Sequence, residues 1–345
     1  MKTSFRLLAA GLLLAVLTGC GWQPAEKEPE PEATTKIESL TVEFAPGGDL
    51  AAKTTLLAPL SEKLQAALKA AGVEVEDVRI VLSTAPAATG QALEEGGVDA
   101  AFLPAEALVE FGGSAAPLLS AAWQAPSCDS SDPADWNGGE TSWTENWTPG
   151  RRVLLLAGPS EYGRNLAARA KSGTELTWEE LSKAGWGLSG GRADDMASLW
   201  LAERYEGNLV SALPDTALFG SQDELLAALA EEKVDVIPMI ADDRIDAAEQ
   251  WTRSVSTGGW GRGALIWDET TVIGVTERYY GTTAAVSAKS AWSGETLSGA
   301  LAEALKSLAD DAEFSALAGA GPFSDIEGED LAPQRRLLEL SGKNG

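Results

Sequence analysis

From Leu40 onward, short runs of apolar and β-branched residues alternate with segments whose apolar residues recur at helical spacing. In the segment 56–72, Leu60, Leu64 and Leu68 share one face of a helix, and Gly72 follows as a stop signal. Apolar runs at 40–46, 78–84, 98–104 and 116–123 are typical of strands. This alternation predicts an α/β fold with mainly parallel sheets and helices on both faces.

The second half of the chain repeats this pattern. Ser or Thr followed three residues later by Glu marks two helix starts, at Thr177 and Ser221. The stretches "EEGGVDAAFLPAE" and "AEEKVDVIPMIAD" share a helix end, a Val-Asp pair, an apolar strand and an acidic residue beyond it. Roughly 300 residues exceed what one core usually supports. Because ligands of open α/β sheets lie outside the carboxyl ends of strands, we expect two lobes with a ligand cleft between them.

The N-terminus predicts export and anchoring. Lys2 and Arg6 precede an apolar run, 7–17, that is shorter than the roughly 20 residues a membrane-spanning helix needs. The next residues, "LTGC", resemble the lipobox of bacterial lipoproteins, in which the cysteine, here Cys20, is lipidated and becomes the new N-terminus. The alternative is an ordinary signal peptide with a chance cysteine. Pro and Glu dominate 21–36, which is typical of an extended tether.

The composition of the chain argues against several classes of function. The chain has 52 acidic and 26 basic residues, so it lacks the excess of Lys and Arg with which proteins neutralise nucleic-acid phosphates. It has no histidine, which excludes Ser-His-Asp triads and His-ligated zinc. Neither a P-loop nor a dinucleotide-binding fingerprint occurs, and the acidic stretch after Cys128 lacks EF-hand spacing. We therefore expect no catalytic residue, no metal, no cofactor and no nucleic-acid partner. With Cys20 lipidated, Cys128 is expected to be a free thiol.

Several motifs in order resemble one family. The signal, "LTGC" and acidic tether are followed by "LTVEFAPGGDL", "APLSEKL", "EEGGVDAAFLPAEALVEF" and "EEKVDVIPMIADDRID". Together they resemble the substrate-binding lipoproteins of phosphonate/phosphite/phosphate ABC importers. The resemblance implies a two-lobed periplasmic-binding-protein type II fold with two hinge crossings, for which 151–159 and 263–274 are the candidates.

The domain boundaries expected on this basis follow the chain in five steps. They are a signal peptide over 1–19, a tether over 20–37, the first part of lobe 1 over 38–150, lobe 2 over 151–262, and a hinge return with the rest of lobe 1 over 263–345. The long segment 124–150 is expected to be a loop, and its length makes it a candidate lid or docking surface.

The resemblance also implies ligand contacts at strand ends. In lobe 1 these are the loop after the first strand, the end of the second strand, and the end of "VDAAF": Phe44, Pro46, Gly47, Thr84, Pro104, Ala105 and Glu106. After the later "VD" strand, Asp242 stands where an acidic residue would meet the amine of an aminophosphonate. Twelve tryptophans would also suit a cationic ligand, because an aromatic face attracts positive charge.

The family's anion-binding turn maps onto Ser189, Gly190, Gly191 and Arg192, but most of its hydroxyl residues are missing here. Asp194 and Asp195 follow in the first turn of the helix. At about 4 Å, a second negative charge costs roughly 4 kcal/mol at an effective dielectric near 20. One interpretation is that an aspartate occupies the place of the ligand's anion. The other is that both are ordinary helix-start residues facing solvent.

The expected function is therefore solute binding at the outer face of the cell membrane. The expected partners are a small-molecule ligand, amine-bearing or zwitterionic, the permease and ATPase of an ABC importer, and the membrane through the lipid anchor. The protein is expected to be a monomer. Two alternatives remain open: a surface sensor or scaffold that kept the fold without transport, and a carboxylate-based hydrolase, which needs two facing acids, one with a raised pKa.

Overall fold

The computed structural model describes residues 35–45 and 53–343, and both of its large sheets belong to one unit, Thr35–Gly345. The expected signal peptide, Cys20 and most of the expected tether lie outside the described residues, as do Pro46 and Gly47. Strand β1 begins at Thr35, so residues 35–37 are strand residues rather than the end of a tether. Among the described residues, no helix combines the length and the apolar character that crossing a membrane requires.

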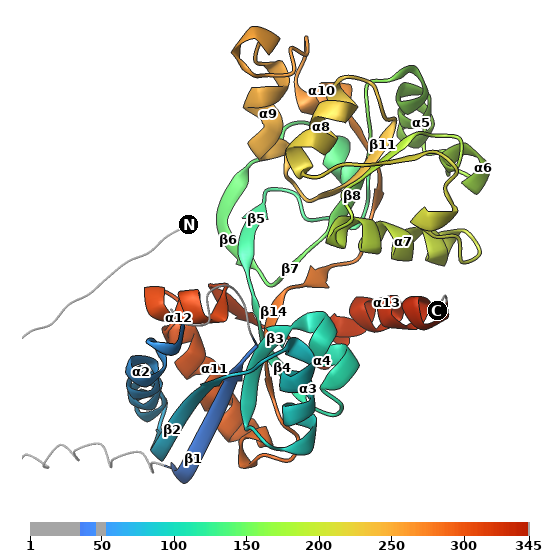
Figure 1. The fold of residues 1–345 in the computed structure, drawn as a ribbon. Helices are drawn as coiled ribbons and strands as arrows, with labels where there is room; N and C mark the ends of the chain where they lie inside the picture. Colours follow the sequence, from blue (N-terminus) through green and yellow to red (C-terminus); the bar gives the residue numbers. More distant parts are fainter. Residues whose placement is uncertain (1–34, 46–52, 344–345) are drawn as a thin grey trace, which may run out of the picture. The chain divides into compact units, whose positions relative to one another are not determined.

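The first sheet has six strands in the order β15-β4-β14-β3-β1-β2 (Figure 1). The pairs β1–β2 and β1–β3 are parallel, whereas β14 and β15 run antiparallel to their neighbours. Its strands are β1 Thr35–Phe44, β2 Val73–Leu82, β3 Ala100–Pro104, β4 Ala116–Ala121, β14 Thr282–Val286 and β15 Phe323–Asp325. The helices connected with it are α2 Leu57–Ala70, α3 Pro86–Glu95, α4 Ala105–Phe111, α11 Glu295–Ser307, α12 Ala312–Ala318 and α13 Ala332–Lys343, with η4 Ala291–Ser293 and η5 Gly328–Leu331.

The second sheet has five strands in the order β10-β9-β11-β8-β12. Here β9 pairs in parallel with β10 and β11, and β8 runs antiparallel to β11 and β12. Its strands are β8 Val153–Ala157, β9 Trp186–Leu188, β10 Thr216–Leu218, β11 Val236–Ile240 and β12 Thr271–Val275. Its helices are α5 Glu161–Lys171, α6 Trp178–Leu181, α7 Arg192–Arg204, α8 Gln222–Ala230, α9 Arg244–Thr252 and α10 Ile266–Glu269, with η2 Val210–Ala212 and η3 Val255–Thr257.

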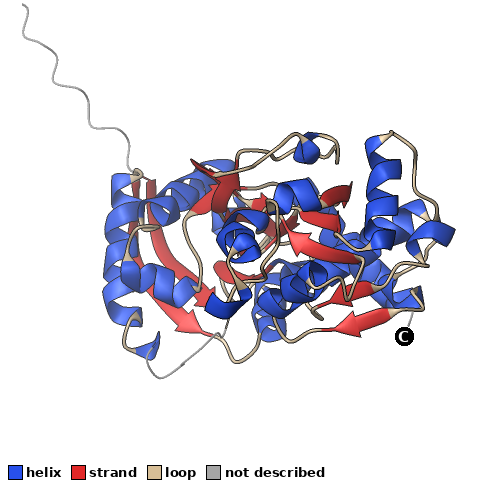
Figure 2. Ribbon diagram, turned by 90° about the horizontal axis from the view of Figure 1, so that it is seen from above, coloured by secondary structure: helices blue, strands red, loops and turns tan. Residues whose placement is uncertain are grey.

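The architecture is α/β with two mixed sheets, and Figure 2 shows the strands in red with helices in blue around them. The predicted α/β class is confirmed, and both sheets are mixed: β14 and β15 in the first sheet and β8 in the second run antiparallel to the strands they pair with. The predicted helix 56–72 is confirmed as α2, and its residues Leu60, Leu64 and Leu68 are buried. They pack in the core of the first sheet, where Phe44 stacks on Phe102 with 4.5 Å between ring centroids.

Two segments connect the sheets, and we name them the crossing segments, 122–152 and 276–281. The first contains the hairpin of β5 Trp123–Pro126 and β6 Trp143–Thr148, with η1 Asp135–Asn137 between its strands. The crossing segments pair with each other through β7 Gly150–Arg151 and β13 Tyr279–Tyr280. The expected crossings at 151–159 and 263–274 instead contribute β8 and β12, which are neighbours within the second sheet. Their apolar residues fill the core of that sheet, which explains why they resembled buried connections.

The expected loop 124–150 is therefore partly regular structure. Asn137 fastens its middle to the edge strand β12, because its side-chain amide donates to the carbonyl of Val272 and accepts from the N–H of Val272 at 2.9 and 2.8 Å. The buried Trp136 beside it donates to the Ser130 carbonyl at 2.8 Å. These contacts hold the segment against the second sheet.

Candidate functional site

The carboxyl ends of β1 and β3 lie at the same edge of the first sheet, where Phe44 pairs with Phe102 in register. A cavity of about 410 Å³ opens there; its lining includes Phe44, Lys53, Phe102, Pro104 and Thr282. Phe44 is almost fully buried, and its ring stacks on Phe102, so it supports the cavity from the core. Of the other residues expected in this lobe, Thr84 is exposed in a bend after β2.

Helix α4 begins directly at the end of β3. Pro104 is exposed at its N-cap, and the buried Ala105 donates its N–H to the Gly281 carbonyl at 2.9 Å. This bond ties the start of α4 to the second crossing segment. Glu106 lies in the first turn, where a carboxylate is favoured by the helix dipole.

At the start of α7, the Asp194 carboxylate binds the backbone of the preceding turn. Its Oδ2 accepts hydrogen bonds from the backbone N–H groups of Ser189 and Gly190, at 2.9 and 2.6 Å. Gly190 has a φ of +71°, which glycine adopts without strain and which forms this turn. The Asp194 carboxylate thus takes up two backbone N–H donors of the turn, groups that would otherwise be free for another acceptor. Asp195 is exposed, as the other interpretation expected for both residues.

Burial dominates the protonation of Asp194. It raises the pKa of the Asp194 carboxyl above the usual value, against the opposing effect of the hydrogen bonds from Gly190 and Ser189. The second oxygen, Oδ1, is buried and has no hydrogen-bond partner among the described residues. A second anion near this carboxylate would meet uncompensated negative charge.

Arg192 joins the two helix starts. Its guanidinium lies 2.8 Å from Glu106 Oε1 on α4 and 3.6 Å from Asp195 Oδ2 on its own helix. Burial raises the pKa of Glu106, and the charge of Arg192 opposes that rise. The structure therefore brings together Glu106, Ala105, Pro104 and the turn Ser189–Arg192 with Asp194, from helices on both sheets.

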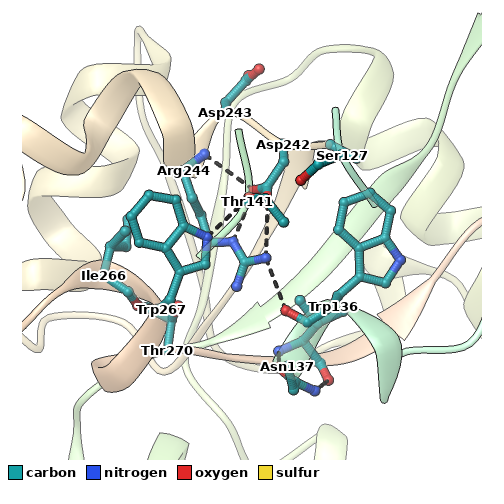
Figure 3. Close-up of polar contacts among 12 residues, drawn as sticks. Ser127, Trp136, Asn137, Thr141, Asp242, Asp243, Arg244, Ile266, Trp267 and Thr270 are labelled. Carbon is teal, nitrogen blue, oxygen red and sulfur yellow. Dashed lines mark hydrogen bonds and ion pairs between the residues drawn. The ribbon is translucent and has the colours of Figure 1, made fainter. Parts of the chain in front are cut away.

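Asp242 is bound within the protein and does not face a ligand site. It is completely buried, and its carboxylate forms a two-pronged ion pair with Arg244, Nε to Oδ1 at 2.8 Å and Nη2 to Oδ2 at 2.9 Å. Thr141 donates to Oδ2 at 2.5 Å and accepts from Trp267 Nε1 at 3.1 Å (Figure 3). Arg244 also donates to the Trp136 carbonyl at 3.2 Å. We correct the expected role: Asp242 offers no free carboxylate to a ligand amine and instead fastens the first crossing segment to the end of β11.

Three residues that the sequence did not single out lie close to this region. Arg151 pairs with Asp243 at 2.9 Å, and burial raises the pKa of Asp243 to about 6. Tyr279, paired with Arg151 in β13–β7, is buried, which raises the pKa of its hydroxyl. The charges of Arg151 and Arg192 oppose that rise in pKa, and those of Asp243 and Glu106 add to it. The double arginine at 151–152 and the double tyrosine at 279–280 were the available signals.

Among the described residues, no cluster of three or more Cys, Asp or Glu has the geometry of a metal site. Cys128 forms no disulfide with the part of the chain that the structure describes, and burial raises the pKa of its thiol. Trp136 and Trp186 are buried in cores, Trp143 donates to Asp246 at 2.9 Å, and Trp123 lies against Tyr279 with 6.3 Å between ring centroids.

No family model matches this sequence. No curated protein matches it either. Among solved structures, the Mycoplasma hyorhinis protein Mh-p37, described as a proposed thiamine pyrophosphate transporter, is 11% identical with a TM-score of 0.50, over 90% of this chain and 99% of that one. Chloride-bound XAC2383 of Xanthomonas citri is 14% identical with a TM-score of 0.44, over 88% and 96%. A binding-protein component of an ABC phosphonate transporter from Pseudomonas aeruginosa is 13% identical with a TM-score of 0.38, over 89% of both chains. The fold is that of type II periplasmic binding proteins.

Proposed function

We propose that this chain is the extracytoplasmic solute-binding component of an ABC importer. It captures a small ligand between the starts of α4 and α7 and delivers it to the permease. The observation that carries the proposal is the meeting of Glu106 and Arg192, 2.8 Å apart, from helices on two different sheets. Charged groups that face each other across two separately folded sheets can close on a ligand, and the closed form gains stability by its higher affinity.

The same geometry supports an amine-bearing or zwitterionic ligand. Asp194 fills the anion position of the α7 turn, and its Oδ1 lacks a donor among the described residues. A ligand ammonium would meet Glu106, while a ligand acid would take the place of Glu106 beside Arg192. A simple dianion such as phosphate satisfies only Arg192 and is repelled by both carboxylates.

The remaining parts of the proposal concern the location of the protein. The "LTGC" motif supports lipidation at Cys20, and the Pro- and Glu-rich stretch after it supports a tether that holds the binding unit away from the membrane. The proposal also includes one lobe around each sheet, with the residues of α10 and β12 in the second lobe and not in the first as expected, and a monomeric state. In this arrangement the permease and ATPase are the protein partners.

A thermal-shift series with matched ligands tests the proposal. We expect 2-aminoethylphosphonate to raise the Tm more than ethylphosphonate or ethanolamine, because only the zwitterion engages both charge types. At about 100 times its Kd, a ligand adds about 2.7 kcal/mol of stability, which corresponds to a rise of about 5 °C for a protein of this size.

Arg192→Gln removes the cation and should reduce the shift with 2-aminoethylphosphonate more than that with ethanolamine. Arg79→Gln is the control, because Arg79 is exposed and pairs with Asp77 on the first sheet, away from α7. A series in which no small zwitterion, anion or amine shifts the Tm would contradict solute binding. Equal shifts in wild type and Arg192→Gln would place the ligand elsewhere.

A further inference from the structure

The C-terminal helix α13 begins on the side of the first sheet. It follows β15 and η5, and Leu331 just before it is buried in one cluster with Ala107 and Leu108 of α4. Gln334 in its first turns is buried, and its side-chain amide reaches the Tyr280 carbonyl at 3.5 Å. The first half of α13 is thus held by α4 and by the second crossing segment.

The second half of α13 packs against the other sheet. Leu337 and Leu340 lie against a buried cluster formed by β8, α7 and β13, whose members are Val153, Ala193, Met196, Leu199 and Tyr279. In the same stretch, Arg336 pairs with Glu203 of α7 at 2.9 Å and also with Glu277 in the second crossing segment. Helix α13 therefore contacts both α4 and α7, the two helices whose first turns hold Glu106 and Arg192.

We propose that α13 is a clasp that fastens α7 to α4 and so controls how readily the Glu106–Arg192 contact opens. Separating the starts of α4 and α7 requires either that Leu337 and Leu340 leave the α7 cluster or that the first half of α13 leaves α4. The apolar contact contributes most of the stabilisation, because Leu337 and Leu340 are partly removed from water against a buried cluster. Arg336 is partly exposed, so its two ion pairs chiefly fix the register of α13 along α7.

The clasp makes a prediction that needs no ligand, so its failure and that of the proposed function are separable. In the full-length protein, Leu337→Ser combined with Arg336→Gln should loosen α7. We expect amide hydrogen exchange in peptides from α7 and from the turn 188–191 to become about tenfold faster. Exchange in α2, which packs in the core of the first sheet, should stay unchanged.

The same helix supplies the control. Leu338→Ser combined with Arg335→Gln changes the same residue types at exposed positions, and Arg335 bonds only to Gly328 in its own segment among the contacts described. This variant should leave exchange in α7 at the wild-type rate. Faster exchange in α2 and α7 alike would show general destabilisation and would overturn the clasp. Wild-type exchange of α7 in the Leu337→Ser, Arg336→Gln variant would overturn it as well.

Discussion

Replacing Arg244 by methionine is expected to lower the free energy of unfolding by about 3 to 5 kcal/mol. Arg244 is almost completely buried, and both oxygens of the equally buried Asp242 accept hydrogen bonds from it. Methionine approximates the length of the arginine side chain, but it leaves the Asp242 carboxylate buried without a positive charge beside it. The donors that remain are the Thr141 hydroxyl and the backbone N–H of residue 244. The cost comes from a buried charge without a counter-charge. Urea unfolding followed by circular dichroism measures it.

Two further variants separate the ion pair from general effects. Arg253→Met, just after the same helix, breaks an exposed pair with Glu249 and should cost less than about 1 kcal/mol. Combining Arg244→Met with Asp242→Leu removes both charges, and most of the lost stability should return, since Thr141 keeps its contact with Trp267. If Arg244→Met lowered the free energy of unfolding no more than Arg253→Met, the Asp242–Arg244 ion pair would not be what stabilises the first crossing segment against β11.

Local patterns predicted the helices well because a helix face is decided by neighbours three and four residues apart. Leu60, Leu64 and Leu68 were placed correctly for this reason. Strand direction is decided by partners that lie far away in the chain. For example, β14 enters the first sheet between β3 and β4, about 180 residues after β3, and nothing in its own sequence states that it runs antiparallel to them. The apolar runs at 151–159 and 263–274 were recognised as buried, but their pairing in one sheet was not.

In the candidate site, too, the local features were predictable from the sequence and the long-range contacts were not. The turn before α7 and the two aspartates after it were visible in the sequence. Which aspartate binds the turn depended on the conformation of its backbone. With Gly190 at positive φ, the carboxylate of Asp194 reaches two N–H groups, while that of Asp195, one position further around the helix, is exposed. The Glu106–Arg192 contact joins α4 and α7, helices that belong to different sheets. Asp242 forms its ion pair with Arg244, two residues later in the chain. A sequence gives the charges, but which of them neutralise each other depends on the tertiary structure.

Replacing Asp194 by serine is expected to raise the affinity for a simple anion at least tenfold. The change removes a negative charge, uncovers the N–H groups of Ser189 and Gly190, and adds a hydroxyl donor at a helix start. Removing a like charge about 4 Å away is worth roughly 4 kcal/mol at an effective dielectric near 20, and tenfold in affinity needs only about 1.4 kcal/mol. Titration calorimetry with methanesulfonate measures the change, because this anion keeps one charge across the useful pH range.

The control and the pH profile decide whether Asp194 itself is responsible. Asp195→Ser makes the same substitution at the exposed neighbour and should change the affinity far less. Asp194→Asn removes the charge but keeps the shape, so its affinity for the anion should lie between those of the wild type and Asp194→Ser.

Because burial raises the pKa of Asp194, its carboxyl binds a proton at a higher pH than an exposed aspartate does. Wild-type affinity for methanesulfonate should therefore increase as the pH falls below neutral, and Asp194→Ser should flatten this profile. Glu106, whose pKa burial also raises, leaves a smaller slope in that variant. Tight methanesulfonate binding by the wild type at neutral pH, weakened by Asp194→Ser, would show that Asp194 supports an anion site instead of filling it.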